Sequence, residues 1–137
     1  MKNVFSLKNL FVVLLFIGIG CQKTEEDHTY ALGKKSTFRI NQPYASTDKQ
    51  YALLIKEVSD SRCPEGLECF WSGEVSLKGT WTSNGITSDI ELHSVMKALQ
   101  KEPEGFTIQI VDAKPYPKSG VESKLEDLVI TLLIQKN

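Results

Sequence analysis

Residues 73–93 read GEVSLKGTWTSNGITSDIELH, and this stretch decides the fold. On either side of Asn84-Gly85, apolar and polar residues alternate, which is the pattern of a β-strand with one buried face. The apolar positions that share a face are Val75, Leu77 and Trp81 before the turn and Ile86, Ile90 and Leu92 after it. Because Asn-Gly readily adopts the two positive φ angles of a type I′ turn, the stretch predicts an antiparallel hairpin.

Similar short segments lie on both sides of the hairpin. They cover residues 36–40, 50–58, 106–112 and 127–135. The inward positions that we expect in the longer three are Tyr51, Leu53, Ile55, Phe106, Ile108, Ile110, Leu128, Ile130, Leu132 and Ile134. In the last segment Val129 and Leu133 lie on the opposite face, which predicts a central strand that is covered on both sides.

Helical propensity is confined to residues 94–100, and Pro103 limits a helix there to about two turns. Residues 114–120, KPYPKSG, are expected to form a loop, because proline cannot donate a ladder hydrogen bond. The chain is therefore predicted to be all-β: an antiparallel β-sandwich or small barrel of about six to eight strands, with one short helix at most. We place this single domain at residues 32–137.

The composition of the 137-residue chain fits one folded domain. Hydrophobic residues make up 41%, and 16 Lys and Arg oppose 17 Asp and Glu, for a formal net charge of −1. A protein that binds nucleic acid through its charge would be strongly basic. We therefore expect no nucleic-acid partner.

The N-terminus has the pattern of an export signal. Lys2 and Lys8 come before an apolar run, LFVVLLFIGI, at residues 10–19, and a polar stretch follows. A bilayer-spanning helix needs about twenty apolar residues, whereas a run of about ten is typical of a secretory signal peptide. We predict that residues 1–20 are a signal peptide and that the mature protein lies outside the cytoplasm.

Cys21 is predicted to carry a membrane anchor. The sequence GIGC at residues 18–21 resembles a bacterial lipobox, whose cysteine takes a diacylglycerol group, although Gly18 stands where leucine is usual. The alternative is an ordinary signal peptide that is cut nearby, which leaves Cys21 as a free thiol. Without residues 1–20 the chain keeps 14 basic and 17 acidic residues, a formal charge of −3. Attachment to the membrane would therefore depend on acyl chains and not on a basic patch.

Residues 21–31 are expected to form a flexible tether, since their acidic run of Glu25, Glu26 and Asp27 cannot bury apolar area. An acidic run soon after a lipidated cysteine resembles the export signal that sends Bacteroidota lipoproteins to the outer face of the outer membrane. The alternative is a solvated spacer. The predicted localisation is lipid-anchored in the outer membrane, on its periplasmic or its cell-surface face.

Cys63 and Cys69 enclose the five residues PEGLE. With Cys21 assigned to lipid, they are an even pair in an oxidising compartment, which favours a structural disulfide. A zinc site would need two further ligands, and Cys-x5-Cys is not the spacing of a zinc knuckle. A redox-active pair would normally be Cys-x-x-Cys. We expect no metal and no cofactor.

The residues beside this cysteine pair are the candidate binding residues. Arg62, Phe70 and Trp71 could form an exposed aromatic and cationic patch for a sugar or a protein, and Tyr116 of the proline-rich loop is a further candidate. The favoured interpretation is structural. In that interpretation Trp71 packs in the core or against the disulfide, and Arg62 pairs with a nearby acid to hold the loop.

The stretch DSRCPEGLECFWSGE at residues 60–74 resembles a family of small bacterial lipoproteins of uncharacterised function. Members share an Asp-Ser-Arg-Cys-Pro…Cys-x-Trp-x-Gly-Glu pattern, followed by a late strand and a Pro-x-Pro loop, which residues 106–117 match. The resemblance implies a secreted β domain with a cystine loop, and it implies no activity.

Three classes of function follow from these features. The favoured one is a lipid-anchored module of the cell envelope that binds a glycan or a protein partner. A protease-inhibitor-like or other structural role is the alternative, because a disulfide-stiffened loop loses little entropy on binding. A hydrolase is less favoured, since the domain has a single histidine, His93, and no Gly-x-Ser-x-Gly motif. We therefore assign no catalytic residues.

Overall fold

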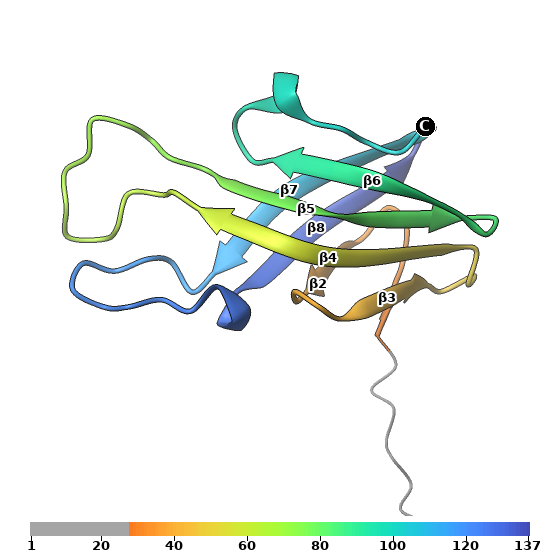
Figure 1. Ribbon diagram of the computed structural model, residues 1–137, viewed down its shortest axis with the longest axis horizontal. Coiled ribbons are helices and arrows are strands. Elements are labelled where there is room, and N and C mark those ends of the chain that lie inside the picture. Colours follow the sequence, from red (N-terminus) through yellow and green to blue (C-terminus); the bar gives the residue numbers. More distant parts are fainter. Residues whose placement is uncertain (1–27) are drawn as a thin grey trace, which may run out of the picture.

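The computed structural model describes residues 28–137, which form two β-sheets packed against each other (Figure 1). The predicted signal peptide, the lipidation site Cys21 and the tether up to residue 27 lie outside the described residues. Between residues 28 and 137, no helix is long and apolar enough to cross a bilayer.

The larger sheet has five strands in the order β1-β3-β4-β5-β6. They are β1 (Thr29–Tyr30), β3 (Pro43–Ser46), β4 (Tyr51–Asp60), β5 (Val75–Ser83) and β6 (Ile86–His93). Neighbouring strands are antiparallel except β1 and β3, which run parallel. The strands β5 and β6 are the predicted hairpin, and Asn84 and Gly85 between them have the expected positive φ angles of 50° and 77°.

The smaller sheet has three antiparallel strands in the order β2-β8-β7. They are β2 (Lys35–Phe38), β8 (Val129–Lys136) and β7 (Phe106–Lys114). Two short 3₁₀ turns, η1 (Lys97–Leu99) and η2 (Leu125–Asp127), are the only helical segments in the described part of the chain. The prediction of an all-β sandwich is confirmed, with eight strands in two sheets.

One apolar core fills the space between the sheets. Trp81 is its largest side chain and is 2% exposed, with its ring 5.5 Å from the ring of Tyr51 and 4.8 Å from that of Phe106. Aromatic rings at these separations attract each other beyond the area they bury. Every position that the alternation predicts to face inward is buried, with the exception of Ile86.

Two expectations about the margins of the sandwich, on Ile86 and on strand β8, are wrong. Ile86 is exposed, because it directly follows the turn, where the hairpin extends past the core. The segment of residues 94–100 forms the single turn η1, which is within the predicted limit of about two turns. Strand β8 is central, as predicted, but Val129 and Leu133 on its outer face are only half-buried, since the described residues add no third layer there.

The folded domain begins earlier than residue 32. Thr29 and Tyr30, which the sequence analysis places in the tether, form β1, and Tyr30 is 2% exposed. The Tyr30 ring packs 5.6 Å from the ring of Phe38 and 6.4 Å from that of Trp81. A two-residue strand has too little alternation to be predicted, and β3, which starts with a proline, is missed for a similar reason.

Candidate functional site

Three loops come together at one end of the sandwich, and we call this the loop end. They are residues 61–74 between β4 and β5, residues 115–124 between β7 and η2, and residues 94–96 between β6 and η1. Figure 1 shows the first two side by side at the left, where they extend beyond the strands. The loop end contains all the candidate binding residues that the sequence analysis named.

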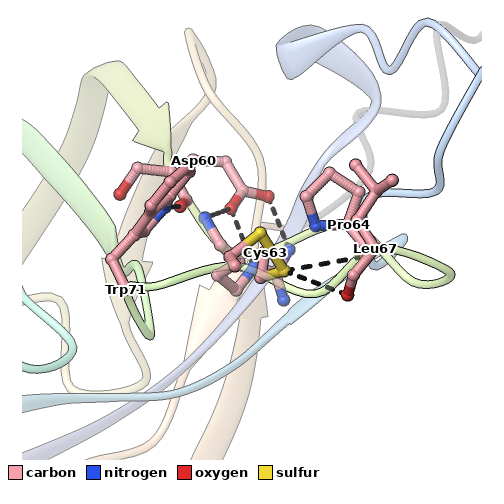
Figure 2. The surroundings of a disulfide bond; sticks show 8 residues. Asp60, Cys63, Pro64, Leu67 and Trp71 are labelled. Atoms are coloured by element: carbon pink, nitrogen blue, oxygen red, sulfur yellow. Dashed lines mark hydrogen bonds and ion pairs between the residues drawn. A yellow bond between two sulfur atoms is a disulfide. The ribbon is translucent and has the colours of Figure 1, made fainter.

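The disulfide predicted from the sequence is present. Cys63 and Cys69 are bonded, with their Cα atoms 5.9 Å apart. Within the ring that they close, the amide of Leu67 donates a hydrogen bond of 3.2 Å to the carbonyl of Pro64, which folds the chain back on itself. Figure 2 shows Leu67 and Trp71 on opposite sides of the disulfide.

Arg62 holds two of the loops together and is not free to bind a ligand. Its guanidinium forms a two-pronged ion pair with Asp60, at 2.8 and 2.6 Å, and donates to the carbonyls of Ala113 and Pro115 at 2.7 and 3.2 Å. The same group lies 4.4 Å from the centre of the Tyr116 ring, a cation–π distance. The hydrogen bond with Asp60 raises the pKa of Arg62, against the opposing effect of burial. The structural interpretation of Arg62 is therefore the correct one.

Backbone hydrogen bonds add to the connection between these two loops. The amide of Glu65 donates to the carbonyl of Pro117 at 2.9 Å, and the amide of Ser119 donates to the carbonyl of Glu65 at 3.1 Å. The Lys118 ammonium lies 4.0 Å from the Glu65 carboxylate. These hydrogen bonds and this ion pair give both loops a defined position relative to the sheets.

Ser61 and Glu74 close the base of the cystine loop. The backbone amide of Ser61 donates to the carbonyl of Glu74 at 2.9 Å, while the Ser61 hydroxyl donates to that carbonyl at 3.1 Å and accepts from the amide of Glu74 at 3.0 Å. Gly73 passes so near that a Cβ on it would lie 2.0 Å from the carbonyl oxygen of Ser61. Gly73 also has a φ of 64°, so only glycine fits this position without strain.

Trp71 and Phe70 lie on the surface. Trp71 is 60% exposed, and its indole N–H donates to the carbonyl of Ser61 at 3.2 Å. Phe70 is fully exposed. Of the two structural alternatives for Trp71, a place in the core is wrong, because the cystine loop extends past the region where the two sheets face each other. Packing against the disulfide stays a prediction. The hydrogen bond holds the indole at its N–H, and more than half of the residue remains open to solvent.

The Glu74 carboxylate connects the cystine loop to the third loop. One oxygen, Oε1, lies 3.0 Å from Nδ1 of His93, and the other, Oε2, accepts from the amides of Val95 and Met96 at 3.2 and 3.1 Å. Burial opposes ionisation of this group, but the hydrogen bonds from Met96, His93 and Val95 outweigh burial and hold the pKa of Glu74 below its ordinary value. Glu74 is therefore a carboxylate at neutral pH.

A hollow of about 280 Å³ lies between these loops. Its lining residues are Ser61, Trp71, Ser72, Gly73, Glu74, Val95 and Met96. Val95 and Met96 are 56% and 51% exposed, so together with Trp71 they form an apolar rim that is open to solvent. The hollow combines apolar walls with one carboxylate, that of Glu74.

The remaining titratable groups near the hollow are His93, Glu91 and, farther along the chain, Glu102. His93 is 6% exposed, and its Nε2 atom has no hydrogen-bond partner in the described part of the chain; the nearest acid oxygen, on Glu91, is 3.5 Å away. The carboxylate of Glu102 accepts from the amide of Ile108 at 2.7 Å and so has a structural role. Residues 28–137 contain no group of three or more His, Cys, Asp or Glu side chains that could hold a metal ion.

Sequence reasoning missed part of this site. It named Phe70, Trp71 and the disulfide, but not the hollow, and it did not anticipate that Val95 and Met96 would join it. The available signal was the adjacent apolar pair Val95 and Met96, two residues after the strand that ends at His93. These residues were assigned instead to a possible helix at residues 94–100.

The fold and the site define a small all-β domain with a hollow built from loops at one end. Comparison with protein families, with curated proteins and with solved structures found no match for this chain. The resemblance of residues 60–74 to a lipoprotein family therefore stays a prediction.

Proposed function

We propose that this protein is a lipid-anchored binding module of the bacterial cell envelope, attached to the outer membrane through Cys21, and that its loop end is the binding surface. The observation that carries the proposal is the exposure of Phe70 and Trp71 on a loop that a disulfide and an ion pair hold in one shape. Large apolar side chains that cluster on a surface mark interaction sites, and a loop that is already ordered loses less entropy when it binds.

The position of the N-terminal strand supports this arrangement. Thr29 pairs with Ala45, which pairs with Ala52 near the start of β4, whereas the cystine loop follows Asp60 at the other end of that strand. Eight residues of strand correspond to about 26 Å. In Figure 1 the chain enters the domain far from the loop end. A lipid on Cys21, seven residues before His28, would therefore be joined to the domain at the end that lies away from the loop end.

The anchor can be tested by metabolic labelling with palmitate, in cells that produce the wild-type protein or C21S. We expect label on the wild type and none on C21S. Proteinase treatment of intact cells then reports the orientation, because digestion shows a cell-surface protein and protection shows a periplasmic one. An unlabelled wild-type protein would contradict the anchoring part of the proposal.

The binding surface can be tested by placing a photo-crosslinking amino acid at Phe70 in intact cells. Ile86 is the matched control, since it is also an exposed apolar residue but lies by the β5–β6 turn at the opposite end of the domain. We expect a discrete crosslinked product from position 70 and none from position 86. Absence of a product at position 70, or identical products at both positions, would contradict the proposal.

A further inference from the structure

The walls of the hollow are suited to an aliphatic chain. Trp71 lines the hollow, and its only polar side-chain group, the indole N–H, is already bonded to Ser61. Val95 and Met96 line the hollow as well, and both are more than half exposed. A volume of about 280 Å³ is large enough for one long side chain and too small for a folded element.

The carboxylate of Glu74 supplies the polar part of the hollow. A carboxylate offers about four acceptor positions, and His93, Val95 and Met96 use three of them. Two of these hydrogen bonds go to Oε2 and one to Oε1, so a further acceptor position remains on Oε1. Glu74 is therefore an anchored anion with one unused acceptor position, and its side chain, which lines the hollow, is 10% exposed.

The charges around the hollow favour a cationic ligand. Residues 60–74 contain four acids, Asp60, Glu65, Glu68 and Glu74, and a single base, Arg62. Asp60 neutralises Arg62, and Lys118 from the neighbouring loop lies near Glu65. None of the seven residues that line the hollow is a lysine or an arginine. Glu74 thus has no lysine or arginine in the hollow itself. Its one titratable partner is His93, 3.0 Å away, and the Lys97 ammonium is held by the carbonyl of His93 at 2.7 Å. The acidic loop disfavours an anionic bilayer surface as the partner.

From these observations we propose that the hollow receives a lysine or arginine side chain of a protein partner. The aliphatic stem would lie against Trp71, Val95 and Met96, and the charged end would donate a hydrogen bond to Oε1 of Glu74. An aromatic face also attracts a cation directly. This inference rests on the proposed binding function and names the chemistry of the partner.

The test uses two small probes and the purified domain. Nα-acetyl-lysine N-methylamide carries the charged end, and Nα-acetyl-norleucine N-methylamide has a similar chain without charge. Each is titrated while NMR records the indole N–H of Trp71 and the amides of Val95 and Met96. We expect saturable shifts with the lysine probe and at least five-fold weaker binding of the norleucine probe. The preference should shrink in 0.5 M NaCl, because salt screens the charge interaction.

Two variants separate the role of Glu74 from general acidity. E74Q keeps an acceptor for the loop amides but removes the charge, so the lysine probe should bind it no better than the norleucine probe. E68Q removes the same charge from an exposed position of the same loop and should change the lysine affinity less than two-fold. W71L, at an exposed position, should weaken both probes, which keeps the test usable if E74Q does not fold.

Two results would overturn this inference. One is equal affinity of the wild type for both probes, and the other is the absence of saturable shifts with either. Neither result affects crosslinking at position 70, which tests the proposed function separately. A crosslinked partner together with equal probe affinities would mean that the loop end binds, but not through a basic side chain in this hollow.

Discussion

Trp81 and Trp71 are only ten residues apart in the sequence, yet they have opposite roles in the structure. Trp81 lies on β5, on the side of its sheet that faces the other sheet, and it is 2% exposed among other aromatic rings. Trp71 lies on a loop beyond the end of the sheets and is 60% exposed. The difference shows that position relative to the second sheet, and not residue type, determines whether an aromatic side chain stabilises the fold or remains available for binding.

The comparison is tested most strongly by removing each indole. W81A should lower the free energy of unfolding by about 3 to 5 kcal/mol, the usual cost of a cavity left by a large buried aromatic residue. W71A should lower it by less than about 1 kcal/mol, since only one hydrogen bond and little burial are lost. Urea denaturation of both variants measures the two values. Equal losses would mean that the exposed position of Trp71 is incorrect.

The next largest effect is expected at Gly73. G73A places a Cβ against the Ser61 carbonyl in a left-handed backbone conformation, so we expect a loss of about 3 kcal/mol. Gly105 is the matched control, because it has a φ of 77° with no atom within 4 Å of the added Cβ. G105A should cost about 1 to 2 kcal/mol from the backbone conformation alone. Equal losses of stability in the two variants would contradict the close approach of Gly73 to Ser61.

Breaking the disulfide should affect the loop end and leave the core around Trp81 unchanged. In the chain-entropy model, closing so short a ring contributes about 2 kcal/mol, so C63S/C69S should lose about that much stability. The core around Trp81 should keep its structure while the cystine loop gains mobility. Hydrogen exchange checks this, with faster exchange expected at residues 64–72 and unchanged exchange in β5. Faster exchange throughout β5 would show that the loop end and the core are one cooperative unit.

The smallest expected effect is the loss of stability at low pH that depends on Glu74. The folded-state pKa of Glu74 is lowered, so its contribution to stability is present above its ordinary pKa and is lost as the pH falls through the folded value. The wild type should therefore lose more stability than E74Q between pH 6 and pH 3. Denaturation of both proteins in urea at the two pH values measures this difference. Parallel loss in the two proteins would show that Glu74 is not held as an anion.

The sequence predicts the sandwich core well, because alternation is a local property of each strand. Val75, Leu77 and Trp81 could be assigned to one face without knowing what they would pack against. Trp71 could not be placed in this way, since its exposure depends on where the loop ends relative to the second sheet. The same limit applies to Glu74. Its hydrogen bonds to Val95 and Met96 join residues that are about twenty positions apart, and no local pattern indicates them.

The most direct test of the account uses the partner recovered by crosslinking at position 70. Isothermal titration calorimetry would measure its affinity for the wild type, F70A and I86A, three proteins that should be equally stable because both side chains are exposed. We predict that F70A binds at least ten-fold more weakly, a change of about 1.4 kcal/mol, and that I86A binds like the wild type. Equal affinities of F70A and the wild type would contradict the assignment of the loop end as the binding surface.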